Sequence, residues 1–148
     1  MPVVPAILAL AERDGGTGKD FIAAFIAGVE AEVRISMLMG ESHYLKGWHT
    51  TATVGTFGAA AAAAHMLGLS TDDCVTAYGI AATQAAGLKS NFGTMCKPLH
   101  AGKAAANGLY AALLAKRGFT SNKEILECGQ GFGDTQSEGI DPEKALEG

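Results

Sequence analysis

Residues 51–67 read TATVGTFGAAAAAAHML and place a small or apolar residue on nearly every face of a helix. A helix that is apolar all round is buried in the interior rather than laid on the surface. Residues 98–117 form a second alanine-rich run. Because small side chains let two backbones approach closely, contacts between such helices are stabilised by dispersion rather than by large side chains. The two runs therefore predict a pair of central helices.

Start and stop signals divide the rest of the chain into shorter elements. They predict helices over residues 5–13, 18–39, 71–86 and 122–128, one further turn from Asp141-Pro142-Glu143, and loops over 41–50, 89–97 and 129–139. The second of these helices spaces Phe21, Ile22, Phe25, Ile26, Val29 and Val33 as one apolar face, with Glu30, Glu32 and Arg34 free to point outward. No segment alternates like a strand. The fold class is therefore all-α, an Ala/Gly-rich multi-helix bundle in a single domain over residues 1–148, with a loop-rich tail over 129–148.

The composition narrows the class of protein. A chain of 148 residues with 48% hydrophobic residues is typical of one globular domain, and a net charge of −4 argues against a nucleic-acid partner. Cys74, Cys96 and Cys128 have no paired spacing, so we expect reduced thiols and a cytoplasmic protein. The longest apolar run falls short of the roughly 20 residues that span a bilayer, and no basic segment opens a signal peptide. No membrane partner is expected.

Two polar stretches lie directly before the alanine-rich runs, at residues 47–51 (GWHTT) and 93–100 (GTMCKPLH). A helix start carries partial positive charge and unpaired N–H groups, so Lys97 and His100 are disfavoured there unless an anion is close. Two such helix starts facing one cleft would hold a small di- or tricarboxylate. Apolar neighbours would also lower the pKa of His49 or Lys97 and suit them to proton transfer. The alternative is a pair of solvated loop residues.

Other motifs carry little functional signal. Residues 15–19 (GGTGK) lack the first glycine, the final Ser or Thr and the preceding strand of a phosphate-binding loop. No set of His, Cys or carboxylate residues has the spacing of a metal site, so no metal is expected. His65 is expected to pack against a neighbour, and Trp48 to anchor its loop.

The two polar stretches and the helices after them resemble the MmgE/PrpD family, which includes 2-methylcitrate dehydratase, cis-aconitate decarboxylase and iminodisuccinate epimerase. The resemblance is carried by GWHTTATVGTFG over residues 47–58, KPLHAGKAA over 97–105 and VVPAILALAE over 3–12. It implies a large helical domain that usually pairs as a homodimer, a smaller α/β lid, and chemistry without metal or organic cofactor. We expect the lid, and a family Asp and His upstream of residue 3, to be absent from this chain.

Carried over to this sequence, the resemblance gives His49 the role of proton donor or acceptor. It gives Lys97 the role of binding a substrate carboxylate or assisting proton transfer, and we add Thr50 and His100 as substrate-binding residues. The implied protein is a lyase or isomerase of a small di- or tricarboxylate, of the 2-methylcitrate dehydratase type. Dehydration, decarboxylation and epimerisation all remain open. Because part of the site is expected to be missing, the alternative is an inactive helical fragment that serves association or dimerisation.

Overall fold

The computed structural model describes residues 2–147, and helices are the only regular elements among them. The long helices are α1 (Val3–Asp14), α2 (Gly18–Leu45), α3 (Thr50–Met66), α4 (Thr71–Ala82) and α5 (Cys96–Lys116). A 3-10 turn, η1 (Lys89–Asn91), precedes α5, and the tail carries α6 (Phe132–Gln136) and α7 (Pro142–Leu146). The prediction of an all-α fold is confirmed. None of the helices within residues 2–147 is long and apolar enough to cross a membrane.

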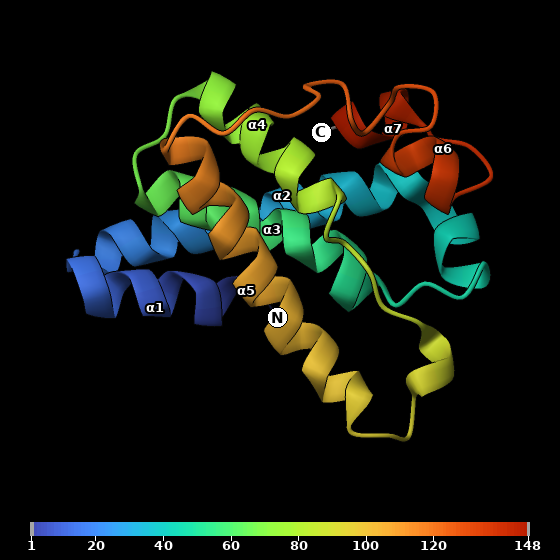
Figure 1. Ribbon diagram of the computed structural model, residues 1–148, viewed down its shortest axis with the longest axis horizontal. Helices are drawn as coiled ribbons and strands as arrows, with labels where there is room; N and C mark the ends of the chain where they lie inside the picture. The colour runs from blue at the N-terminus through green and yellow to red at the C-terminus, as the bar shows by residue number, and fades with distance from the viewer. Residues whose placement is uncertain (1, 148) are drawn as a thin grey trace.

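Helix α3 is the centre of the molecule, as its sequence predicts. Every residue from 52 to 64 is buried, and α1, α2, α4 and α5 all pack against it (Figure 1). Phe57 is the largest side chain in this interior and is fully buried. Its ring meets Tyr78 of α4 and Phe132 of α6 edge to face, at centroid distances of 5.9 and 4.8 Å. The other helices thus pack around one central, alanine-rich helix.

Glycines set how closely the neighbouring helices approach α3. A Cβ added at Gly108 of α5 would lie 2.5 Å from the Thr56 carbonyl oxygen and from Ala59 Cβ. A Cβ at Gly28 of α2 would lie 2.8 Å from Ala62 Cβ. Real side chains do not tolerate such distances, so both contacts depend on the missing methyl group. The close approach expected between the two alanine-rich helices is confirmed at Gly108, and α2 also approaches α3 closely at Gly28.

Three of the predicted helix starts, those of α2, α4 and α7, are confirmed by side-chain caps. Thr17 and Asp20 form a reciprocal capping box before α2, and Ser70 accepts from the Asp73 backbone N–H before α4. Asp141 caps α7 in the same manner, with Pro142 in its first turn. Local polar side chains are therefore enough to fix where these helices begin.

Several predicted boundaries are wrong. Gly40 adopts a non-helical conformation (φ 60°, ψ −170°), but the chain resumes its helix afterwards and continues to Leu45 instead of forming a loop. Helix α4 ends at Ala82 rather than at residue 86. The Ser121 hydroxyl donates to the Thr76 carbonyl oxygen instead of capping a helix, and residues 123–127 form turns. In the tail, α6 forms where a loop was expected, because its buried Phe132 packs into the core.

The apolar face expected for α2 is buried only in part. Phe21 and Val29 are half-buried, and Phe21 packs against the core cluster of Val3, Ile7, Ala24 and Ala62. Ile22, Phe25, Ile26 and Val33 are exposed by 60, 39, 59 and 48%. The buried face instead carries Ala24, Gly28, Ile35, Leu38 and Met39. At Gly28 the physical reason is the close approach of α3, because a Cβ there would lie 2.8 Å from the Gly58 carbonyl oxygen. Glu32, expected to point outward, is half-buried beside Gly55 and Gly58 of α3.

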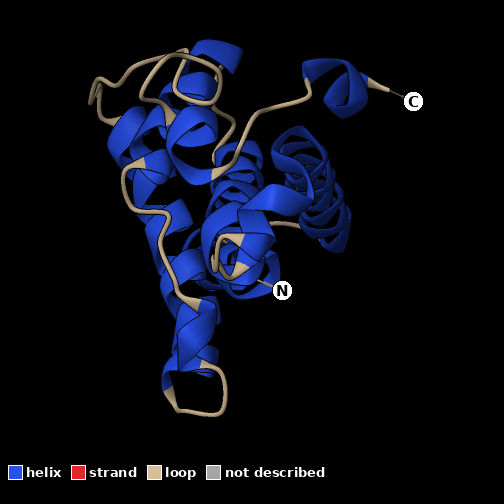
Figure 2. Cartoon of the chain, turned by 90° about the vertical axis from the view of Figure 1, so that its right-hand side faces the viewer, coloured by secondary structure: helices blue, strands red, loops and turns tan. Residues whose placement is uncertain are grey.

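One part of the molecule projects from this bundle. Figures 1 and 2 both show η1 and the first turns of α5 reaching away from the other helices. Every residue from 92 to 99 is exposed. The second polar stretch of the sequence therefore lies at the surface, on a projecting arm.

Candidate functional site

The backbone joins the two loops on which the candidate site depends. His49 is the N-cap residue of α3, and its N–H donates to the Gly87 carbonyl oxygen at 2.9 Å. The Lys89 N–H donates to the Gly47 carbonyl oxygen at 2.8 Å, so residues 47–49 and 87–89 form a short antiparallel bridge. This bridge fixes the start of α3 against the segment that leads into η1 and α5.

Across this bridge, three of the predicted site residues come together. A hydrogen bond of 2.9 Å joins Nδ1 of His49 to Nδ1 of His100, which lies in the second turn of α5. The His49 ring also meets the Phe92 ring edge to face, with centroids 4.8 Å apart. The Lys97 ammonium lies 5.2 Å from the centroid of the same Phe92 ring. His49, Lys97, His100 and Phe92 form what we call the imidazole–lysine cluster.

Phe92 was missed by the analysis of the sequence. It lies in the loop between η1 and α5, and its side chain is 38% exposed. The only sequence signal was its position, five residues before Lys97. Its contacts with both an imidazole and an ammonium group depend on tertiary packing, which no local pattern shows.

Gly87 makes room for the histidine pair. A Cβ at this position would overlap Ala52 Cβ of α3 and lie 3.3 Å from the His100 ring. The sequence predicted that Gly87 ends a helix, but α4 has already ended at Ala82. Its role in the structure is to let the His100 ring and the first turn of α3 meet.

The electrostatic setting of the cluster is positive. Burial lowers the pKa of His49 below its ordinary value of 6.5, and the nearby charges of His100 and Lys97 lower it further. The His49 imidazole, which is only 8% exposed, is therefore neutral near pH 7. Neither α3 nor α5 has an acidic residue in its first turn to offset the helix dipole. The cluster thus offers a neutral base beside a cation and two helix N-termini.

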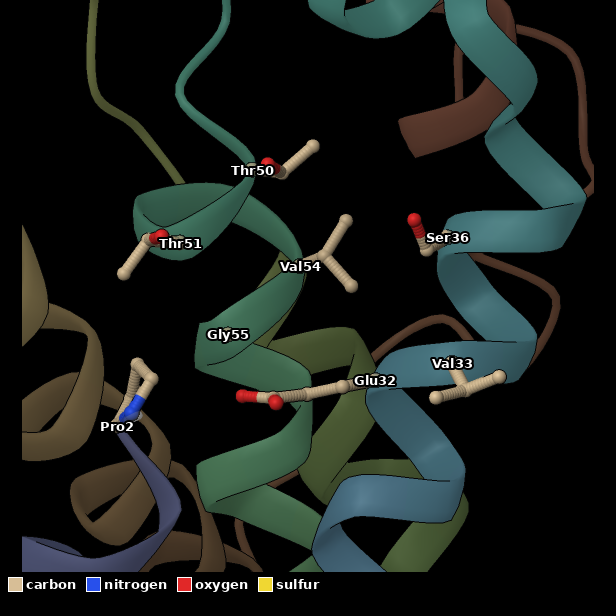
Figure 3. Close-up of a pocket in the computed structure, with 8 residues that line it drawn as sticks. All are labelled: Pro2, Glu32, Val33, Ser36, Thr50, Thr51, Val54 and Gly55. Carbon is tan, nitrogen blue, oxygen red and sulfur yellow. The ribbon is translucent and has the colours of Figure 1, made fainter.

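Thr50 lies apart from this cluster. It faces α2 and lines a cavity of about 270 Å³ with Glu32, Ser36 and Val54. Figure 3 shows Thr50 and Ser36 on opposite sides of this cavity, with Glu32 reaching toward Gly55. Burial raises the pKa of Glu32, yet its carboxyl group still makes this cavity a poor place for a polycarboxylate. The structure thus groups three of the four predicted residues and separates the fourth.

His43 is a second residue that sequence analysis did not single out. It is fully buried in α2, and its ring stacks on Trp48 at 6.3 Å between centroids. Its Nδ1 is 3.0 Å from the Gln136 carbonyl oxygen, which can only accept, so Nδ1 carries the proton. Its Nε2 then accepts from the Thr53 hydroxyl at 2.7 Å. Burial lowers the pKa of His43, and the neutral ring holds Trp48 and the first turn of α3 in place.

The remaining histidine does not join a site. His65 was expected to pack against a neighbour, but it is exposed in the last turn of α3, where the buried stretch of that helix ends. Within residues 2–147, no three His, Cys, Asp or Glu side chains gather in the way a metal ion requires. Trp48 does anchor its loop, through His43 and the bridge to Leu88.

Comparison with known proteins relates the whole chain to a known family. The family model of the MmgE/PrpD N-terminal domain matches residues 1–145. The human and mouse proteins named cis-aconitate decarboxylase are each 40% identical over 136 residues, which cover 88% of this chain and 28% of theirs. The cis-aconitate decarboxylase of Aspergillus terreus is also 40% identical, over 87% of this chain and 28% of its own length. The chain therefore spans less than a third of the length of these relatives.

Proposed function

The chain belongs to the MmgE/PrpD family, and from this premise we propose that the imidazole–lysine cluster is part of the active site of a lyase or isomerase. Its substrate is a small di- or tricarboxylate, and no metal or organic cofactor takes part. Lys97 binds a carboxylate group, and His49 gives or takes the proton. Because the relatives compared above are named cis-aconitate decarboxylases, decarboxylation is the first reaction to test. Dehydration of the 2-methylcitrate type and epimerisation are the alternatives.

The observation that carries this proposal is the pairing of a neutral imidazole with an exposed ammonium group across one aromatic ring. A dianion binds most favourably where fixed cations and helix N-termini converge and no carboxylate of the protein repels it. A base for removing a proton next to a carboxylate must be unprotonated at working pH, and burial keeps His49 in that state. Both requirements are met by residues that the fold brings together from different helices.

The chemistry then needs few steps. In decarboxylation, the C–C bond to the departing carboxylate breaks, CO2 leaves, and its electron pair stays on carbon. The Lys97 ammonium stabilises the remaining carboxylate as charge spreads onto it. A proton from the histidine pair then quenches the carbanion. In dehydration or epimerisation, the same imidazole would instead remove a proton from the carbon next to the carboxylate.

Calorimetry with cis-aconitate, citrate and 2-methylcitrate tests the proposal on this chain. We expect one of them to bind, and Lys97→Ala to weaken binding about tenfold or more, because a charge-assisted hydrogen bond contributes about 1.5–3 kcal/mol. Lys103→Ala is the matched control, since Lys103 is an exposed lysine farther along α5. An equal loss of affinity in both variants, or an unchanged affinity in Lys97→Ala, would contradict the role assigned to Lys97.

A second candidate function is association through α2. Ile22, Phe25, Ile26 and Val33 form an exposed apolar stripe along this helix. Contiguous apolar surface of this kind marks contact sites between proteins. Under this proposal the chain forms homodimers through the stripe, whether or not it is catalytically active. Its location in the cytoplasm remains an expectation from its three unpaired cysteines.

A further inference from the structure

We propose that His49 and His100 act together as a two-imidazole proton relay, which rests on the proposed function of the imidazole–lysine cluster. His100 is then a partner in proton transfer rather than only a substrate-binding residue. The relay moves a proton between the substrate and water through the hydrogen bond that joins the two Nδ1 atoms.

The geometry of the pair restricts where protons can reside. A hydrogen bond between two Nδ1 atoms at 2.9 Å requires that one atom carries hydrogen and the other offers a lone pair. In the neutral pair, the donor ring therefore has an unprotonated Nε2, and the acceptor ring has a protonated Nε2. The pair always presents one base and one acid at its two outer nitrogens.

Both outer nitrogens are open to a ligand. Within residues 2–147, the structure gives no hydrogen bond to Nε2 of His49 or of His100. Neither atom is among the polar side-chain atoms of that part that are sealed from solvent without a partner. A substrate held at Lys97 can meet one Nε2 while water meets the other.

The transfer balances without any other reactant. When the substrate protonates the free Nε2 of the donor ring, that ring becomes an imidazolium. Its Nδ1 proton passes to the Nδ1 lone pair of the partner, and the partner releases its own Nε2 proton to water. Both rings end neutral, with their tautomers exchanged. In the reverse direction, the pair delivers a proton from water to a carbanion.

The surroundings favour a pair that holds no more than one extra proton. His100 and Lys97, both from α5, are the charged or titratable groups that act on His49, and both oppose its protonation. A second proton on the pair would also break the hydrogen bond and place two cations side by side. The extra proton is therefore shared through the hydrogen bond between the two Nδ1 atoms, which couples the two rings.

Long-range 1H–15N NMR of the imidazole rings in this chain tests the relay directly. Above the titration range, we expect one of the two rings to be the Nδ1–H tautomer and the other the Nε2–H tautomer. The signals of both rings should move together as the first proton binds. Two Nε2–H tautomers, or two independent titrations, would overturn the proposal.

His100→Asn gives a second measurement, because the amide group can hydrogen-bond near the place of Nδ1 but cannot relay a proton. We expect His49 to titrate alone in this variant, with a single fixed tautomer. His65→Asn is the control, since His65 is exposed at the far end of α3. An unchanged His49 titration in His100→Asn would contradict the coupling.

Adding cis-aconitate to the same samples separates this proposal from the proposed function. Ligand-induced shifts at both rings support the relay. Binding with uncoupled imidazoles contradicts the relay alone. If the two imidazoles are coupled but their signals do not change on adding cis-aconitate, citrate or 2-methylcitrate, the proposed function is contradicted. The shared proton would then still be supported.

Discussion

Phe92 touches both groups on which the proposed chemistry depends, the His49 imidazole and the Lys97 ammonium. Replacing it with alanine removes the ring that covers one edge of His49. Because burial is the main cause of the lowered pKa of His49, Phe92→Ala should raise that pKa toward its ordinary value. An NMR titration of the His49 ring measures the change. Phe119→Ala is the control, since this exposed phenylalanine follows α5; a shift of equal size there, or none in Phe92→Ala, would contradict the prediction.

The two buried histidines predict how stability depends on pH. Burial lowers the pKa of His43 and of His49, so near pH 6.5 these two side chains bind more protons in the unfolded chain than in the folded one. The contribution of the two histidines to the free energy of unfolding should therefore be greatest above this value and decrease as the pH falls through it. Urea unfolding at several pH values measures the fall. His65→Gln should leave its slope unchanged.

Glu32 opposes this trend and provides an internal check. Burial raises its pKa above the ordinary 4.5, so its contribution to stability grows as the pH falls toward that value. Glu32→Gln should make the loss of stability on acidification steeper. A shallower loss would show that the carboxyl group does not hold its proton more tightly in the folded state.

Residues near a helix start can be singled out in the sequence more readily than residues that meet only across the fold. His49, Lys97 and His100 were singled out as candidates because they lie in the polar stretches directly before two alanine-rich runs. Phe92 and His43 were not, since their roles depend on partners brought together by the fold. Thr50 is adjacent to His49 in sequence but lines a cavity against α2, so neighbours in the sequence need not face the same side of α3.

Among the elements, the contact between α3 and α5 offers the sharpest test of the packing. Gly108→Ala should destabilise the fold by about 1–3 kcal/mol, because the added methyl group meets the backbone of α3 at 2.5 Å. Gly102→Ala on the same helix meets nothing within 4 Å and should stabilise it by up to about 1 kcal/mol. Chemical denaturation of both variants measures the difference. Equal effects would mean that the two helices are not in close contact at Gly108.

Helix starts were easier to predict than helix ends or buried faces. A cap is a local hydrogen bond, so Thr17 and Ser70 could be identified from the sequence alone. The end of α4 and the continuation of α2 past Gly40 depend on what the following residues meet in space. The orientation of α2 was predicted wrongly because hydrophobicity alone favours its large residues, while the shape of α3 favours Ala24 and Gly28.

The molecule presents two surfaces of different chemistry, the imidazole–lysine cluster and the apolar stripe of α2. In the imidazole–lysine cluster, His49 at the start of α3 contacts His100 and Phe92 of the projecting arm. The arm also exposes Met95 and Leu99, by 89 and 57%. The stripe of α2 carries no histidine or lysine between Ile22 and Val33. Substitutions on the stripe can therefore be made without changing the residues of the cluster.

This separation makes the second candidate function testable by itself. If the stripe joins two copies of the chain, each buried isoleucine contributes roughly 1.5–3 kcal/mol, and Ile26→Lys should weaken dimerisation about tenfold or more. Sedimentation velocity over a wide range of concentrations measures it, with Tyr110→Lys as a control on the exposed side of α5. The substitution should leave the fold and any polycarboxylate binding intact, because Ile26 is 59% exposed. A wild-type chain that stays monomeric at every concentration would contradict association through α2. Binding of a polycarboxylate by that monomer would still support the proposed role of the imidazole–lysine cluster.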